Sequence, residues 1–242
     1  MPLLLHRAPR ADALADGLAA LLGEPPADPF APELVIVPAR GVERWLSQRL
    51  SHRVGAAPGR EDGVCAGVEL RSPASLVGEV LGTTDDDPWA PDALVWPLLE
   101  VVDEAAGEPW CRALSLHLGH EHQGEERELR RGRRYATARR LARHLAAYAA
   151  QRPSLLDDWE SGRDTDGAGG RLDPDLSWQP ELWRRLVARV GAASPVARHR
   201  EVCAALRSGA LDPALPSRLS LFGHTRVPVT EVELLAALWE HR

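Results

Sequence analysis

The sequence contains no lysine, and all 29 of its basic residues are arginine. A coding bias toward GC-rich codons would account for this replacement across the whole surface. The chemical consequence is the same whatever the cause. A Walker A loop places a lysine on the β- and γ-phosphates of ATP, so this chain cannot form a working P-loop.

Cysteines and long apolar runs are also scarce. Cys65, Cys111 and Cys203 are odd in number and widely spaced, which argues against a disulfide framework and fits a reducing compartment. Without a CxxC spacing they are expected to be small buried residues. No apolar run has membrane-spanning length, and the apolar start MPLLLHRAP is too short for a signal peptide. We therefore expect a cytoplasmic protein with no membrane partner.

The composition is otherwise that of an ordinary globular protein, with 26% charged and 44% hydrophobic residues. A chain of 242 residues is long enough for one large or two small domains with a real core. The net charge of −6 does not point to nucleic acid as a partner. Any such role would depend on a local basic patch.

The central stretch is 33–50, ELVIVPARGVERWLSQRL. The apolar run Leu34–Val37, followed by turn residues and then by apolar residues at helical spacing, predicts a buried parallel strand feeding a helix. Trp45 and Leu46 are expected in the core of that helix. Ligands of open α/β sheets bind where such a strand ends, which makes Arg40 a candidate phosphate contact. A purely structural surface arginine explains the same pattern equally well.

The N-terminal third alternates strands and helices. Leu3–Leu5 is predicted as a first strand, 6–23 contains a helix, and 67–70 is a further strand. Ser72 and Pro73 are typical of an N-cap and a first helical position, predicting a helix that continues to Leu81. A β-α-β-α order implies parallel strands.

From Asp92 onward the pattern is helical, with helices predicted over 94–102, 110–118, 125–151, 178–191 and 195–206. A strand at 219–222 and a last helix follow. The predicted class is α/β with a parallel sheet and an inserted all-helical subdomain. The predicted domains are 1–87, 88–212 and 213–242. The sheet has too few strands for a complete doubly wound domain, so we expect a truncated part of a longer chain.

Other candidate sites are weak. His117, His120 and His122 do not have the i, i+4 spacing of a helical zinc site and are more typical of a polar loop. The acidic run Asp85–Asp87 precedes a proline and is expected to be a solvated turn or helix entry. No GxSxG motif is present, and no nucleophile is paired with a base. We expect neither a metal site nor catalytic residues.

An arginine-rich segment, 127–144, is the densest basic feature. Arginines along a helix, with Tyr135 and Tyr148 interleaved, could meet a phosphate backbone or stack on bases. A solvated helix face that pairs with the acidic segments nearby is about as plausible. Arginines buried against Asp157, Asp158 or Glu160 would instead serve the fold. The candidate DNA-binding residues, together with two from the central stretch, are Arg40, Arg44, Arg130, Arg131, Arg134, Arg139, Arg140 and Arg143.

Four blocks of sequence together resemble one known family: 33–51, 133–162, 178–186 and 215–238. Their specific features are Tyr148, Arg152-Pro153, Trp159, Trp178, Trp183, Leu215-Pro216, Gly223 and Pro228. In this order they resemble the N-terminal part of the gamma subunit of exodeoxyribonuclease V, the RecC family. The resemblance covers essentially all of this chain but only the first part of far longer family chains.

The resemblance implies a RecA-like fold of the superfamily 1 helicases that has lost its ATPase function. The Walker A position would fall on His6, Arg7 and Arg10, with neither glycine nor lysine. The Walker B strand would end in Gly223 and His224, without an acid to hold magnesium. The chain is therefore expected to hold no cofactor, while ATP and magnesium act on partner subunits.

The partners implied are DNA, at a single-stranded tail or fork, and the beta and alpha subunits of a helicase–nuclease complex that processes double-strand breaks. DNA contact would be directed at phosphates and poor in sequence information. Two alternatives stay open. The chain could be an autonomous ATP-dependent helicase or nuclease, against which the missing lysine and acid argue. It could also be a partner-binding scaffold without DNA contact, which the acidic net charge slightly favours.

Overall fold

The computed structural model describes residues 4–24, 26, 28, 30–57, 59–60, 62–83 and 86–241. They form two compact units. Unit 1 comprises 1–82, 205–227 and 235–242, and unit 2 comprises 83–204 and 228–234. Each unit is taken by itself. The domain boundaries expected from the sequence stay a prediction.

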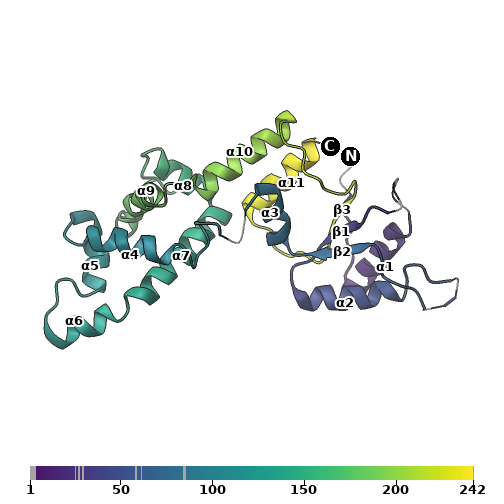
Figure 1. Ribbon diagram of the computed structural model, residues 1–242, viewed down its shortest axis with the longest axis horizontal. Helices are drawn as coiled ribbons and strands as arrows, with labels where there is room; N and C mark the ends of the chain where they lie inside the picture. Colours follow the sequence, from purple (N-terminus) through teal and green to yellow (C-terminus); the bar gives the residue numbers. More distant parts are fainter. Residues whose placement is uncertain are drawn as a thin grey trace. The chain divides into compact units, whose positions relative to one another are not determined.

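Unit 1 is built on a parallel sheet, in which the described residues form three strands in the order β2-β1-β3 (Figure 1). The strands are β1 (Glu33–Ile36), β2 (Val68–Arg71) and β3 (Leu219–Leu221). All four residues of β1 are buried, as expected for a central strand with neighbours on both edges. The buried parallel strand predicted from 34–37 is thus confirmed.

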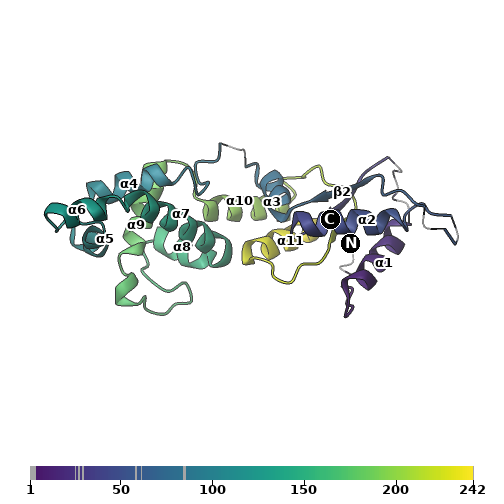
Figure 2. The same cartoon turned by 90° about the horizontal axis from the view of Figure 1, so that it is seen from below.

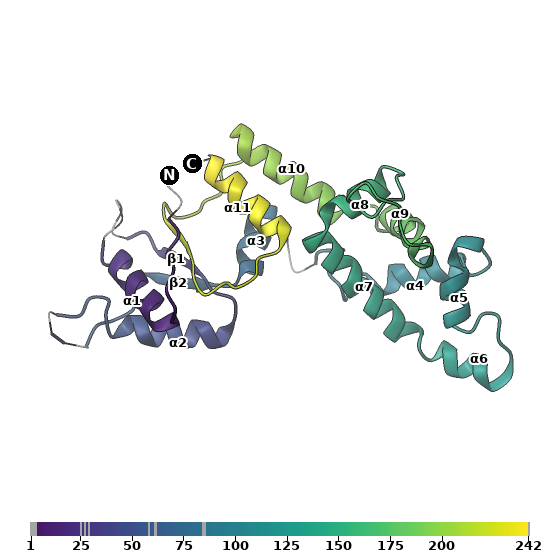
Figure 3. The ribbon, with the colours of Figure 1, turned by 180° about the vertical axis from the view of Figure 1, so that it is seen from behind.

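Helices cover the sheet of unit 1. Side chains from α1 (Ala11–Leu22) and α2 (Arg40–Ser51) share one core with Val35, Val37 and Phe222. Helix α3 (Pro73–Leu81) lies across the sheet from them (Figure 3). The Ser72 hydroxyl accepts from the Ser75 amide at 3.2 Å, and Pro73 is the first helical residue, which confirms the predicted cap.

Unit 2 is helical, and its described residues form no strand. Its long elements are α4 (Val95–Glu104), α5 (Arg112–His117), α6 (Gly124–Arg131), α7 (Arg134–Gln151), α8 (Pro153–Glu160), α9 (Gln179–Val190), α10 (Pro195–Ser208) and α11 (Val229–His241), the last two extending into unit 1. Two short 3-10 turns, η1 (Pro109–Cys111) and η2 (Pro174–Leu176), connect them. Helix α4 packs against α7 and α9, and α8 packs against α7 and α9 (Figure 2).

Leucines and tryptophans fill the core of unit 2. Trp159 and Trp183 are fully buried, and Trp89 packs against Trp183 with ring centroids 5.2 Å apart. The indole N–H of Trp159 donates to the Thr165 carbonyl at 3.0 Å, which anchors the 161–171 loop. Gly167 has φ +79°, and a Cβ there would lie 2.8 Å from the Leu155 backbone, so only glycine fits where this loop meets α8.

Three local predictions are wrong. Leu4 and Leu5 lie outside the sheet, with 66% and 75% of their surface exposed, whereas Leu3 falls outside the described residues. A short apolar run without a ladder partner gains nothing from the strand conformation. The long helix predicted over 125–151 is broken at Gly132, which ends α6, because glycine weakens a helix interior by about 1 kcal/mol.

Trp45 is the third correction. Leu46 is fully buried as expected, but Trp45 is 38% exposed and stacks on Phe222 with ring centroids 6.2 Å apart. Adjacent positions on a helix differ by about 100°, so Trp45 and Leu46 point in different directions from α2. Leu46 and Leu50 form the buried stripe of α2, and Trp45 lies at its edge.

The predicted α/β class, with a parallel sheet and a helical part, is confirmed by three parallel strands and eleven α-helices within the described residues. The RecA-like assignment stays a prediction. No helix of the described chain is long and apolar enough to cross a membrane.

Candidate nucleic-acid interface

Helix α7 carries the largest share of the arginine cluster. Its 18 residues include four arginines and no acidic residue. Ala138, Ala142 and Leu145 are the buried residues of this helix. Arg139, Arg140 and Arg143 are exposed and lie away from that stripe. The helix therefore presents a positively charged face to solvent.

These three arginines are weakly held or free. The Nε of Arg139 lies 3.8 Å from the Asp92 carboxylate, and the Nε of Arg140 lies 3.4 Å from the Nε2 of His144. Arg143 has no hydrogen bond or ion pair within the described structure. An exposed guanidinium without a strong internal partner can bind a phosphate at little cost.

The other arginines of the cluster are tied to protein groups. Arg130 donates to the Leu116 carbonyl at 3.1 Å and to Glu126 at 2.8 Å, and this hydrogen bond holds the pKa of Glu126 below its usual value. Arg131 lies 3.5 Å from Glu128. Arg134 donates to Asp103 across the α4–α7 contact. They are less available to an external anion than Arg143.

Asp157, Asp158 and Glu160 have hydrogen-bond partners outside α7. Asp157 accepts from Arg200, and Asp158 accepts from Arg163 at 2.6 Å. Glu160 accepts from the indole N–H of Trp183 at 3.0 Å. The arginines of the cluster are therefore not buried against these three acids, although Arg130, Arg131 and Arg134 do pair with other acids nearby.

A second group of free arginines lies in unit 1. Arg40 is the first residue of α2, just beyond the carboxyl end of β1, and Arg44 follows one turn later. Both are exposed and have no partner among the residues that the structure describes. Ala39 provides no side-chain cap, so the first amides of α2 are also open to an anion. The geometry suits a phosphate. Arg40 and Arg44 belong to unit 1, whereas α7 belongs to unit 2.

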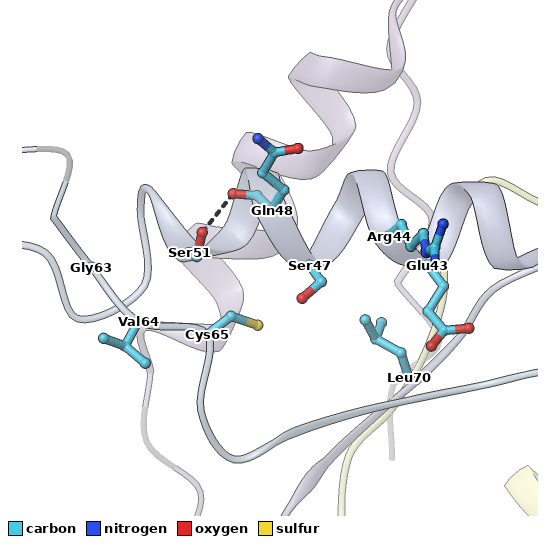
Figure 4. A pocket seen from close by; sticks show the side chains of 9 residues that line it. All are labelled: Glu43, Arg44, Ser47, Gln48, Ser51, Gly63, Val64, Cys65 and Leu70. Carbon is cyan, nitrogen blue, oxygen red and sulfur yellow. Dashed lines mark hydrogen bonds between the residues drawn. The ribbon is translucent and has the colours of Figure 1, made fainter.

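A pocket of about 520 Å³ lies between α2 and the loop before β2 (Figure 4). It is lined by Glu43, Arg44, Ser47, Gln48, Ser51, Gly63, Val64, Cys65 and Leu70. Glu43 and Arg44 are its charged groups and have opposite signs. Burial raises the pKa of the Cys65 thiol, so this cysteine is not an activated nucleophile. The pocket has no concentration of charge that would select a phosphate.

The expected remnant of a nucleotide site is only partly assembled. The Nε2 of His224 lies 3.2 Å from the Ile36 carbonyl, which holds the loop after β3 against the end of β1. Gly223 has φ +71° and lies beside Val42 of α2. Arg10 pairs with Asp12 at 2.5 Å. His6 and Arg7 are both exposed, and neither has a hydrogen bond or ion pair with these residues within the described chain.

The other candidate sites that the sequence offered are its closely spaced histidines, an acidic run and the three cysteines. The Nε2 of His122 lies 3.6 Å from the Glu126 carboxylate. Within the described residues, no three His, Cys, Asp or Glu side chains lie close enough together to hold a metal ion. Asp86 is an exposed turn residue, as expected, whereas Asp87 is partly buried and its carboxylate accepts from Arg198 at 2.7 Å and from the Trp89 amide at 3.1 Å. Asp85 falls outside the described residues. Cys111 and Cys203 are buried, as predicted, whereas Cys65 is only partly buried.

The sequence reasoning missed Trp96. This residue is 64% exposed, and its ring lies 6.1 Å from the ring of Tyr135, which is 52% exposed. The signal was present in the sequence. Leu94, Val95 and Leu98 follow the apolar stripe of α4, and Trp96 falls outside it.

Comparison with known proteins agrees with the resemblance. The chain matches the family model described as RecC, N-terminal domain, over residues 3–242. It is 60% identical over its full length to RecBCD enzyme subunit RecC of Mycobacterium tuberculosis and 58% identical over 241 residues to that of Mycolicibacterium smegmatis, covering 21% and 20% of those chains. The Escherichia coli subunit is 24% identical over 225 residues, 88% of this chain and 18% of its own. The chain thus spans about a fifth of these relatives and belongs to the RecC family.

Proposed function

We propose that this chain is the DNA-contacting, ATPase-inactive region of the gamma subunit of a RecBCD-type exodeoxyribonuclease V. Its task is to engage a single-stranded tail or fork during double-strand break repair and recombination. The relatives are named as subunits of the RecBCD enzyme, and they are about five times longer than this chain. Helicase and exonuclease activities then belong to the complex in the cytoplasm, with the beta and alpha subunits as protein partners.

One observation carries the DNA part of this proposal. The exposed face of α7 bears Arg139, Arg140 and Arg143 without a single acid in the helix. A net charge of −6 makes such a local excess of positive charge unusual for this chain. Phosphate-directed arginines give affinity without sequence readout. Arg40 and Arg44, at the carboxyl end of β1, offer a second, smaller contact of the same kind.

The proposal also assigns unit 1 to a RecA-like fold without its ATPase. Parallel strands in the order β2-β1-β3, with helices on both faces, are compatible with part of such a domain. Neither the loop after β1 nor any other part of the sequence supplies a P-loop lysine. Strand β3 is followed by Phe222-Gly223-His224, which offers no carboxylate for magnesium. ATP and magnesium would then act on partner subunits.

The test is equilibrium binding of a single-stranded oligonucleotide to the purified chain over a range of salt concentrations. Phosphate contacts release counterions, so log affinity should fall linearly with log salt, by about 0.7 per contact. Weak binding that does not depend on salt would contradict the proposal.

A partner-binding scaffold without DNA contact is the second candidate. It is favoured by the many arginines that pair with acids inside the chain, such as Arg185 with Glu108 at 2.6 Å and Arg198 with Asp87 at 2.7 Å. If the chain is such a scaffold, its arginines serve ion pairs within the protein and not contacts with DNA. Binding to the other subunits without any affinity for DNA would support this candidate.

A further inference from the structure

The rings of Trp96 and Tyr135 form an exposed aromatic pair on unit 2. Their centroids are 6.1 Å apart and their planes meet at 55°. The pairs Trp89–Trp183 and Tyr148–Trp159 in the same unit each include a fully or almost fully buried tryptophan. The indole N–H of Trp96 and the hydroxyl of Tyr135 have no hydrogen-bond partner in the described structure. Both rings are more than half exposed, even though they contact each other.

The aromatic pair continues directly into the arginine face of α7. Tyr135, Arg139 and Arg143 are four residues apart, so they follow one line along the helix at steps of about 6 Å. Trp96 joins the start of this line from α4, which packs side by side with α7 (Figure 1). Among the described residues, Arg139 has one ionic partner, the Asp92 carboxylate at 3.8 Å, and Arg143 has none. Two aromatic rings are thus followed by two cationic groups along one exposed strip.

We propose that Trp96 and Tyr135 stack on the bases of single-stranded DNA while Arg139 and Arg143 contact its phosphates. This inference rests on the proposed DNA contact and adds what the strand does at α7. A strip of aromatics and arginines is the surface that binds single strands with little sequence preference. Duplex DNA would not expose base faces to these rings. A protein partner could also cover exposed aromatics, but the acid-free, positively charged helix beside them favours a polyanion.

The experiment compares the 242-residue chain with Trp96→Leu and Tyr135→Leu variants in binding to a short oligothymidylate. Stacking predicts about tenfold weaker binding for each variant, with an unchanged dependence on salt, since no phosphate contact is lost. Trp96→Phe and Tyr135→Phe keep an aromatic face and should retain most of the affinity. They also keep the test decisive if a leucine variant folds poorly. Phe30→Leu is the matched control, because Phe30 is 94% exposed and lies in unit 1.

A second arm removes the bases instead of the rings. An oligonucleotide with consecutive abasic sites should bind the unaltered chain more weakly than intact DNA. The same abasic sites should make little difference to the Trp96→Leu/Tyr135→Leu double variant. Together these results would identify base stacking at this pair.

The outcomes separate the two proposals. If DNA binds with the expected salt dependence but the leucine variants bind as tightly as the unaltered chain, stacking is overturned and the phosphate contact stands. If no DNA binds at all, both proposals fail. If the leucine variants bind DNA normally but lose affinity for the other subunits, the aromatic pair is a protein interface.

Discussion

The guanidinium of Arg218 binds both carboxylate oxygens of Glu33, 185 positions earlier in the chain. It also donates to the carbonyls of Leu21 and Glu24 at 3.0 and 2.9 Å. Glu33 is the first residue of β1, and Arg218 immediately precedes β3. One side chain therefore connects two adjacent strands and the end of α1. The hydrogen bond that Arg218 donates to Glu33 raises the pKa of Arg218 further above neutrality.

Replacing Arg218 by methionine should lower the free energy of unfolding by about 3–5 kcal/mol, because it leaves the carboxylate of Glu33 buried without a counter-charge. Denaturant unfolding followed by circular dichroism would measure this loss. Arg60→Met is the control, since Arg60 and Asp62 form an exposed pair that contributes about 1 kcal/mol or less. Equal losses in the two variants would contradict a structural role for Arg218.

Two neighbours on α2 give a second prediction. Leu46→Ala should cost roughly 2–5 kcal/mol of stability, because Leu46 is fully buried in the core of unit 1. Trp45→Ala should cost less, roughly 1–2 kcal/mol, because the indole is 38% exposed and loses its contact with Phe222 together with only part of a core residue's burial. Thermal unfolding midpoints of the two variants provide the comparison. A larger loss for Trp45→Ala would restore the original expectation of a core tryptophan.

Helices and strands could be predicted from the sequence where a local residue pattern is enough to stabilise them. The apolar run of β1 and the Ser72-Pro73 cap of α3 are local signals, and both elements formed as expected. The strand prediction for Leu4 and Leu5 was wrong because a strand needs a neighbouring strand with which to pair. The residue pattern does not show whether that neighbour exists. The prediction that Trp45 is a core residue was wrong because helical spacing alone does not distinguish the centre of a buried stripe from its edge.

The candidate site was less predictable for a similar reason. Residue type and spacing identified the arginines of α7 but not which of them have internal partners. Arg130 donates to the Leu116 carbonyl, whereas Arg143 has no partner in the part of the chain that the structure describes, and this difference depends on tertiary contacts. The contact between Trp96 and Tyr135 likewise requires α4 and α7 to pack against each other, and a local sequence pattern does not predict which helices pack together.

The Asp87–Arg198 pair predicts a pH dependence. Burial by itself would raise the pKa of Asp87, but hydrogen bonds from Arg198 and the Trp89 amide outweigh it and hold the pKa below its usual value. The charged carboxylate therefore stabilises the fold above about pH 4, the unfolded pKa, and this contribution is lost as the pH falls below that value.

Asp87→Asn should accordingly destabilise the chain near neutral pH by roughly 1.5–3 kcal/mol, and the difference should shrink in acid. Unfolding midpoints measured from neutral pH downward would show the two curves converge. Asp62→Asn, in an exposed pair, is the control. A difference that stays constant down to the acid limb would rule out the carboxylate charge as its cause.

The chain alone should neither bind nor hydrolyse ATP, since it has no lysine for a P-loop and no acid directly after β3. A phosphate-release assay with magnesium, on protein purified to constant specific activity, would measure this. Magnesium-dependent turnover that co-purifies with the chain would mean that nucleotide is handled by residues other than a P-loop.

The salt dependence of single-stranded DNA binding by an Arg139→Gln/Arg143→Gln variant tests the central claim most directly. If the exposed face of α7 contacts phosphates, the slope of log affinity against log salt should flatten by about 1.4, two contacts at about 0.7 each, with stability nearly unchanged. The control variant Arg163→Gln/Arg200→Gln removes two arginines of the same unit that pair with Asp158 and Asp157, and its slope should match that of the unaltered chain. An unchanged slope in the Arg139→Gln/Arg143→Gln variant would show that α7 does not contact DNA.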